Sequence, residues 1–306
     1  SYLNAQCKIY KSRVPVGVIE DIQEIVDCQV WQEGKVIDNI CSQSIPTNLI
    51  TREPTMNKFS TLSACITLLL SISVSAATPL HEKITAAMKM AYRSKAELAR
   101  DANRDPVQAL TFIGLRDDMK VIEFLPAGQA WYTKILGPVL ADKGELHLLD
   151  SRQTFTRWGD LLENAAFKST KAIAIENSYS RTEGRYVLGE LNLGIDDADL
   201  FLNIREYHNF NEADKARLNR AAFNALKPGG RYVVIDHTRR HMQPETRALG
   251  RREDPVQVIL EVQAVGFELE KASNMFFREN DALDLEVGDA SVTGQTDRLF
   301  LVFKKP

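Results

Sequence analysis

The stretch Leu226–His237, which reads LKPGGRYVVIDH, carries the clearest structural pattern in the chain. A Lys-Pro-Gly-Gly turn follows a helical pattern, and either glycine can take the positive φ angle that caps a helix. The turn leads into the apolar run Arg231–Ile235, which is typical of a buried strand. Asp236 and His237 stand where that strand ends. The stretch therefore predicts a helix, a tight turn and a buried strand with polar residues at its end.

Short apolar runs alternate with helical stretches on both sides of this stretch. The predicted strands are Lys120–Phe124, Glu145–Leu149, Ala172–Ile175, Asp199–Ile204, Arg231–Ile235 and Arg298–Phe303. The predicted helices are Trp131–Ala141, Thr154–Ala166, Glu212–Leu226 and Pro255–Val265. Right-handed crossovers between such units build a parallel sheet with helices on both faces and all strand C-termini at one edge. We therefore predict an α/β, Rossmann-like doubly wound domain over residues 117–306, with ligands at that edge.

A helical segment, residues 78–116, precedes this domain. Residues 82–101 place Ile84, Met88, Tyr92 and Leu98 on one stripe, which predicts a single helix. The proline at position 106 makes its continuation unfavourable. A second, short helix is predicted over Val107–Ile113.

The composition excludes several kinds of site. The four cysteines all lie in the first 65 residues, so the predicted domain has no disulfide framework, thiolate metal site or cysteine nucleophile. A net charge of −3 gives no reason to expect nucleic acid as a partner. One local basic cluster is interpreted as a solvated or substrate-facing edge; it consists of Arg239, Arg240, Arg247, Arg251 and Arg252.

Residues 56–77 have the pattern of a secretory signal peptide. Met56-Asn57-Lys58 gives a short positive start, an uncharged stretch follows, and the small residues before Ala77 suit a signal peptidase. A buried helix or a membrane anchor is the alternative, although the stretch is only marginal in length for a span.

A signal acts from an N-terminus, yet residues 1–55 precede Met56. We expect residues 1–55 to be a non-native upstream extension and the mature protein to begin near Ala77. The protein would then be periplasmic or secreted, with no stable membrane span after signal removal. It would be cytoplasmic if the signal is not used. The alternative is a small extra domain before a membrane anchor, because apolar residues alternate over 14–36 and could pair as strands.

Two acids end neighbouring predicted strands. Glu123 precedes a tight loop of the kind in which glycines let a nucleotide-like ligand approach the backbone, and only Gly128 remains there. An ordinary strand-to-helix turn is the alternative. Asp150 ends the second strand, where an acid can accept hydrogen bonds from a ribose diol.

Titratable residues concentrate where the strand Asp199–Ile204 ends. Arg205, Tyr207 and His208 follow it, and His237 lies on the same predicted edge. A histidine beside an acid suits general-base catalysis, whereas a solvated loop is the alternative. No ligand spacing supports a metal site, so none is expected.

In this order, the segments resemble a class I S-adenosylmethionine-dependent methyltransferase. More narrowly, they resemble a family of predicted bacterial methyltransferases that are often exported. The resemblance covers residues 99–306. It is carried by Ala99-Arg100-Asp101 with Arg104 and Pro106, the Glu-x-x-Pro loop with Trp131-Tyr132-Thr133, Arg205 with His208-Asn209, Leu226–Gly230, Asp236-His237, Asp254-Pro255 and Gly294–Arg298.

The resemblance implies a mostly parallel seven-stranded sheet whose last strand inserts antiparallel. It implies S-adenosylmethionine as cofactor, with the methionine part facing the loop and the ribose facing the second acid. The implied cofactor-binding residues are Glu123, Pro126, Ala127, Gly128, Trp131, Tyr132, Asp150 and Asn203.

The chain departs from the family pattern at three positions. Ala127 and Gln129 stand where glycines are expected, and Arg251 stands where a histidine is usual. An alanine at position 127 is tolerated if its φ angle stays negative, whereas Gln129 places a longer side chain near the cofactor space.

Methyl transfer to an unknown small-molecule acceptor is the function that these residues predict. His208 or His237 would be the base, with Arg205 and Tyr207 positioning the acceptor. The alternative is a non-catalytic binding protein of the same fold, which the missing glycines and export would favour. A nicotinamide-dependent oxidoreductase shares the acid at the second strand but requires a Gly-x-Gly-x-x-Gly spacing that this chain lacks.

Overall fold

The computed structural model describes residues 5–9, 26–32, 35–39, 79–182 and 184–306. The chain divides into two compact units, residues 1–71 and 72–306. The first unit contains an antiparallel sheet in the order β1-β2-β3, built from Ala5–Ile9, Val26–Gln32 and Lys35–Asn39. The predicted signal peptide lies outside the described residues.

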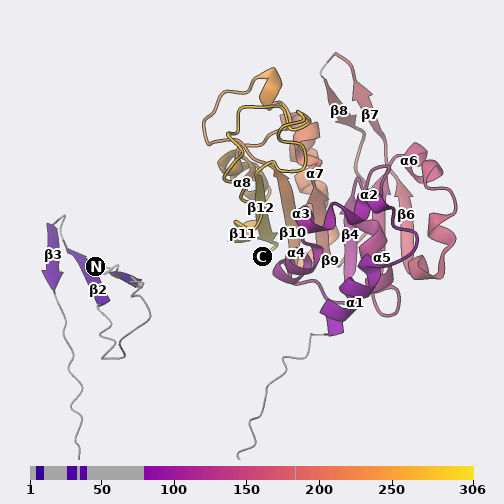
Figure 1. The fold of residues 1–306 in the computed structure, drawn as a ribbon, viewed down its shortest axis with the longest axis horizontal. Helices are drawn as coiled ribbons and strands as arrows, with labels where there is room; N and C mark the ends of the chain where they lie inside the picture. Colours follow the sequence, from indigo (N-terminus) through magenta and orange to yellow (C-terminus); the bar gives the residue numbers. More distant parts are fainter. Residues whose placement is uncertain (1–4, 10–25, 33–34, 40–78, 183) are drawn as a thin grey trace, which may run out of the picture. The chain divides into compact units, whose positions relative to one another are not determined.

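A seven-stranded sheet forms the centre of the second unit (Figure 1). Its strands are β4 (Lys120–Phe124), β5 (Glu145–Asp150), β6 (Thr170–Ala174), β9 (Ala198–Ile204), β10 (Leu226–His237), β11 (Glu268–Ala272) and β12 (Arg298–Lys304). The order across the sheet is β11-β12-β10-β9-β4-β5-β6, and β12 runs antiparallel to both neighbours. The other pairings are parallel. The predicted Rossmann-like sheet with an antiparallel last strand is confirmed.

Helices cover both faces of this sheet because successive strand residues point to opposite sides. Val233 packs in one hydrophobic cluster, with α1, α4 and α5, while its neighbour Val234 packs in the other, with α7 and α8. The helices are α1 (Pro79–Met88), α2 (Lys95–Leu98), α3 (Asp101–Arg104), α4 (Pro106–Ile113), α5 (Thr133–Leu140), α6 (Arg152–Arg157), α7 (Glu212–Ala225) and α8 (Pro255–Gln263). None of those in the described part of the chain is long and apolar enough to cross a membrane.

Two predicted helices are broken in the structure. The expected helix over residues 82–101 ends at Met88, and Ser94 then starts α2 with a capping box to Glu97. The expected helix Thr154–Ala166 ends at Arg157, after which two 3₁₀ turns, η1 (Leu161–Glu163) and η2 (Ala165–Phe167), complete the segment. Gly159, with a φ of 59°, follows the end of α6. Local capping by polar residues therefore interrupted two patterns that apolar spacing alone predicted as continuous.

The Lys-Pro-Gly-Gly turn has a different structural role from the one predicted. Helix α7 ends at Ala225, and its C-cap is Leu226 in an extended conformation, so neither glycine caps the helix. Gly229 has a φ of 80° within an irregularity at the start of β10. A Cβ on Gly230 would lie 2.9 Å from the carbonyl oxygens of Ala198 and Lys227. The glycines therefore allow the bulged strand to approach β9 closely.

Three strands of this unit were not predicted. Strand β11 is an edge strand with mostly exposed residues, so it has no apolar run. The other two, β7 (Asn177–Ser180) and β8 (Arg185–Leu188), form an antiparallel hairpin. Figure 1 shows this hairpin projecting beyond the end of the sheet next to β6 and α6. It therefore adds residues to the edge at which the parallel strands end.

Candidate functional site

The strand order reverses between β4 and β9, and two cavities lie at the carboxyl ends of these strands. Ligands bind at such switch points in open α/β sheets. The first cavity, of about 180 Å³, is lined by the loop after β4, by the residues after β9 and by Arg104. The second, of about 450 Å³, is lined by the other side of the loop, Asp150, α6 and the β7–β8 hairpin. The cavities share four lining residues, namely Leu125, Ala127, Gly128 and Glu206.

The loop after β4 has the backbone of a glycine-rich loop although it holds one glycine. Leu125, Ala127 and Ala130 have φ angles of 49°, 57° and 50°. Ala127 therefore does not meet the condition of a negative φ, and the left-handed region is occupied by residues that carry a Cβ. Gly128 lies outside that region, but a Cβ added there would meet no atom within 4 Å. Its missing side chain leaves open space next to the loop backbone.

Hydrogen bonds from both sides fix this loop. The backbone nitrogen of Ala127 donates to Asp150 Oδ2 at 3.0 Å, and Trp158 Nε1 donates to the Ala127 carbonyl oxygen at 3.0 Å. The Leu125 nitrogen donates to the Leu149 carbonyl oxygen at 2.8 Å. Strand β5 and helix α6 therefore hold the loop in its left-handed conformation.

Asp150 ends β5, as predicted, and is almost fully buried at 3% exposure. Burial raises the pKa of Asp150, although hydrogen bonds from Thr154, Ser151 and Ala127 act in the opposite direction. The backbone nitrogens of Ala127 and Ser151 donate to different oxygens of this carboxylate. Asp150 also lines the second cavity, so a ligand bound there would meet an acceptor group.

The first cavity is closed on one side by buried side chains of β4 and the loop. Glu123 accepts a hydrogen bond from Thr133 Oγ1 at 2.7 Å, and burial raises its pKa to about 7. Trp131 and Tyr132 pack edge to face at 4.6 Å, and Trp131 Nε1 donates to the Glu97 carbonyl oxygen at 3.0 Å. The predicted cofactor-binding residues Glu123, Pro126, Trp131 and Tyr132 all line this cavity.

The carboxylate of Asp236, on β10, orients His208, which follows β9. It is fully buried and accepts hydrogen bonds from His208 Nδ1 at 2.7 Å and from the backbone nitrogens of His208 and His237. Burial would raise the pKa of Asp236, but the neighbouring histidines and these hydrogen bonds lower it to about 2. Since Nδ1 is held, Nε2 is the nitrogen of His208 that can accept a proton, and it makes no hydrogen bond within the described residues.

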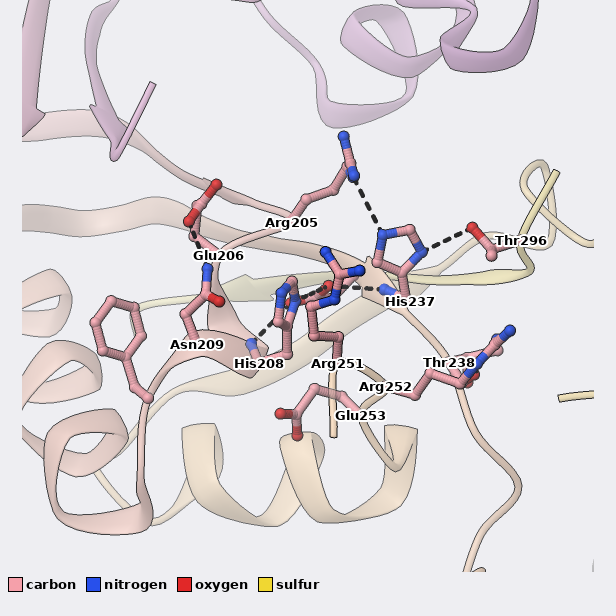
Figure 2. Close-up of polar contacts among 12 residues, drawn as sticks. Arg205, Glu206, His208, Asn209, His237, Thr238, Arg251, Arg252, Glu253 and Thr296 are labelled. Atoms are coloured by element: carbon pink, nitrogen blue, oxygen red, sulfur yellow. Dashed lines mark hydrogen bonds and ion pairs between the residues drawn. The ribbon is translucent and has the colours of Figure 1, made fainter. Parts of the chain in front are cut away.

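His237 is held between Arg205 and Thr296. Arg205 Nε donates to His237 Nε2 at 3.3 Å, and His237 Nδ1 lies 2.7 Å from Thr296 Oγ1 (Figure 2). Burial lowers the pKa of His237 well below 6.5. The negative charge of Asp236 acts to raise this pKa, whereas the positive charge of Arg205 lowers it further. The imidazole is therefore neutral with its free lone pair already engaged, so it orients Arg205 instead of serving as a free base.

Comparison with solved structures adds to this description, whereas no family model and no curated protein matches the chain. The cyclase SpnF matches with a TM-score of 0.50 and 14% identity, over 75% of this chain and 93% of its own. A methyltransferase dependent on S-adenosylmethionine from Aquifex aeolicus matches with a TM-score of 0.49 and 14% identity, over 73% of this chain and 97% of its own. Human N-acetylserotonin methyltransferase, in complex with S-adenosylmethionine, matches with a TM-score of 0.44 and 10% identity, over 74% of this chain and 56% of its own.

The domain has a Rossmann-like fold, which it shares with SpnF. One neighbour is named as a cyclase, so this fold alone does not fix the reaction, and function has to be derived from the site.

Four predicted site residues, Asn203, Tyr207, His208 and His237, line neither cavity. Tyr207 is fully buried; its hydroxyl donates to Glu261 Oε2 at 2.8 Å and accepts from Asn219 Nδ2 at 2.9 Å. The predicted role of Tyr207 in positioning an acceptor does not agree with this placement. Asn203 is also fully buried and donates to the Tyr232 hydroxyl at 3.3 Å. The side chains of Tyr207 and Asn203 therefore belong to a buried polar network with Asn219 and Tyr232.

The prediction from sequence did not include two residues that line the cavities. Glu206 lines both of them, accepts a hydrogen bond from Asn209 Nδ2 at 2.7 Å, and has a pKa that burial raises to about 7. Its place in the polar run after β9 was the available signal. Arg104 comes from the helical segment before the sheet and lines the first cavity. Its sequence neighbourhood gave no reason to place it there.

Proposed function

We propose that the domain transfers a methyl group from S-adenosylmethionine to a small-molecule acceptor. The loop after β4 is the observation that carries this proposal. Left-handed backbone angles at Leu125, Ala127 and Ala130 are unfavourable for residues with side chains, and such strain is kept mainly at functional sites. An ordinary connection between β4 and α5 would not need three residues with left-handed backbone angles.

The residues around the loop fit this cofactor. Gly128 has no side chain in a place where a Cβ would project into open space, so a ligand can approach the backbone. Asp150 lines the second cavity with a carboxylate, the group that accepts hydrogen bonds from ribose hydroxyls, and Tyr179 and Tyr186 offer aromatic faces in the same cavity. Glu123 lies in the first cavity, on the side expected for the methionine part. When bound, S-adenosylmethionine supplies an electrophilic methyl group.

Glu206 is the residue best placed to accept the proton that the acceptor loses. It lines both cavities, and its pKa of about 7 lets it exchange a proton near neutral pH. His208, oriented by Asp236, is the second candidate because its Nε2 carries a free lone pair. Arg205, held by His237, is left to bind the acceptor or the cofactor.

Calorimetric titration of the full chain with S-adenosylmethionine and with S-adenosylhomocysteine tests the proposal. Both are expected to bind. An Asp150→Asn variant keeps the size of the side chain but weakens acceptance of the ribose hydroxyls, so it should bind both ligands more weakly. Absence of binding of either ligand at millimolar concentration would reject methyl transfer from this cofactor.

The missing glycines motivated the alternative of a non-catalytic binding protein. In the structure the loop takes glycine-type angles at Ala127 itself, so the substitutions do not displace its backbone from a form that ligands can approach. That motive for the alternative is therefore weakened. Binding of the cofactor without turnover of any acceptor remains the result that would favour it.

A further inference from the structure

Four arginines from three segments gather at or beside the first cavity. This arginine cluster consists of Arg100, Arg104, Arg205 and Arg298. Arg104 and Arg205 line the cavity directly. Arg100 Nη1 donates to the side-chain oxygen of Gln129, another lining residue, at 3.4 Å. Segments about a hundred residues apart in the sequence therefore place their positive charges at one end of the sheet.

The fourth member, Arg298, is buried beside the others. It is 7% exposed, its Nη1 lies 3.5 Å from the carbonyl oxygen of Asn103, and its Nε has no hydrogen-bond partner. Arg104 is equally buried, and its guanidinium lies 4.4 Å from the centre of the Trp131 ring. An aromatic face and a distant carbonyl group are weak partners for buried charges.

No carboxylate of the described residues forms an ion pair with the cluster. The ion pairs that arginines form in the described part of the chain involve other arginines. Every pair within the cluster is close enough for mutual repulsion. Burial, reinforced by this repulsion, lowers the pKa of Arg104 to about 9 and that of Arg298 to about 10, so both stay charged at neutral pH.

The acids nearest to the cluster are only partly ionised. Burial raises the pKa of Glu123 and of Glu206 to about 7, even though Arg104 and Arg205 respectively act to lower them. At neutral pH these two carboxyl groups supply about one negative charge between them. The cavity therefore keeps an excess of positive charge in surroundings that solvate it poorly.

We propose that the methyl acceptor carries a carboxylate or phosphate group and that this group binds to the arginine cluster. The inference rests on the proposed methyl transfer. Guanidinium groups bind both kinds of oxyanion with paired hydrogen bonds. The cofactor's own carboxylate does not account for the cluster, because S-adenosylmethionine also brings an ammonium and a sulfonium charge. A second anion is needed to balance the site when the cofactor is present.

Inorganic phosphate and malonate are the probes, added to the full chain at constant ionic strength adjusted with potassium chloride. The melting temperature is measured with and without each anion. Both anions should raise it for the wild type. The variants are Arg298→Met and Arg104→Met, which keep an unbranched apolar chain and remove one charge. The control is Arg116→Met, an exposed arginine paired with Asp118.

Two results are expected from the cluster variants. Arg298→Met should melt at a higher temperature than the wild type when no anion is present, because it removes repulsion and an unpaired nitrogen. The rise caused by phosphate should fall by more than half in both cluster variants and stay unchanged in the control. A purely structural arginine would behave differently, since its replacement would lower the melting temperature and leave the response to phosphate unchanged.

Titration with S-adenosylhomocysteine separates the cluster from the cofactor site. Its affinity should change by less than about threefold in Arg298→Met, whereas phosphate binding weakens by about tenfold or more. The proposal is overturned if phosphate and malonate leave the wild type unchanged, or if Arg298→Met weakens S-adenosylhomocysteine but not phosphate. Failure of the proposed function is distinguishable, because it appears as lost cofactor binding with the phosphate response intact, which still supports an anion site.

Discussion

Replacing Ala127 with glycine should stabilise the protein. Ala127 has a φ of 57° and is exposed, so its methyl group makes little packing contact that the substitution would remove. The neighbouring Gly128 is the matched control, because its φ lies outside the left-handed region and an added Cβ would meet no atom within 4 Å. The two substitutions, Ala127→Gly and Gly128→Ala, therefore exchange the same methyl group at adjacent positions with different backbone strain.

The size of the effect follows from two opposing terms. A residue with a Cβ costs about 1–2 kcal/mol in the left-handed region. Glycine loses more conformational entropy on folding, which returns about 0.5–1 kcal/mol of that gain. The net stabilisation from Ala127→Gly is therefore about 0.5–1 kcal/mol, and the melting temperature should rise by about 1–4 °C for a domain of this size. Gly128→Ala should also stabilise, by about 0.4–1 kcal/mol, because it reduces the entropy of the unfolded chain.

Thermal unfolding followed by circular dichroism measures both changes, and calorimetry measures cofactor binding in the same samples. Ala127→Gly should keep the affinity for S-adenosylhomocysteine. Gly128→Ala should weaken it, because the new methyl group occupies the space beside the loop. A lower melting temperature for Ala127→Gly would show that the left-handed conformation is not strained. Strain in the loop would then no longer support the proposed methyl transfer.

Four further predictions concern other parts of the molecule. The folded state holds Glu206 with a pKa of about 7, above the 4.5 of the free group. Its contribution to the free energy of unfolding is therefore fully present below pH 4.5 and is lost as the pH rises through 7. In urea-unfolding titrations, Glu206→Gln should remove up to about 3 kcal/mol of this loss of stability between the two pH values. Asp236 has a pKa of about 2, so its contribution to stability is present above pH 3.8 and is lost as the pH falls through 2. An Asp236→Asn variant should therefore not show this loss of stability in acid. Gly230→Ala should destabilise the protein by about 1–3 kcal/mol in the same assay, because its Cβ would lie 2.9 Å from two carbonyl oxygens; an unchanged midpoint would contradict the close approach. For the export hypothesis, N-terminal sequencing of exported protein expressed from Met56 should find Ala77 or Thr78 as the first residue, and an intact Met56 would contradict it.

The sequence predicted the sheet well because each buried strand carries its own apolar run. Four of the seven strands of the sheet, β4, β5, β9 and β10, are parallel, central and mostly buried, and β12 is also apolar. The edge strand β11 escaped prediction, because an edge strand needs apolar residues on one face only and ELEKA has few. The two broken helices were predicted as continuous, because apolar spacing does not report where one helix ends and a polar N-cap such as Ser94 starts the next.

The candidate site was predicted only where chemistry follows directly from strand ends. Glu123 and Asp150 lie where the sequence placed them, because the last residue of a parallel strand must reach the edge of the sheet. The sequence could not tell which residues after β9 face the cavity. Glu206 lines it, whereas Tyr207 turns into the core, and only the packing of the 3₁₀ turn that follows β9 decides between them.

By itself, the sequence determined the order of strands and helices and the polar character of the strand ends, because these depend on neighbours within a few residues. The tertiary structure decided the rest. The left-handed angle at Ala127 is set by two hydrogen bonds, one that its nitrogen donates to Asp150 and one that its carbonyl oxygen accepts from Trp158, and both partners come later in the chain. The arginine cluster joins side chains that are up to 198 positions apart, from Arg100 to Arg298. A local sequence pattern cannot predict that these arginines lie close together, because only the folded sheet brings their segments to one edge.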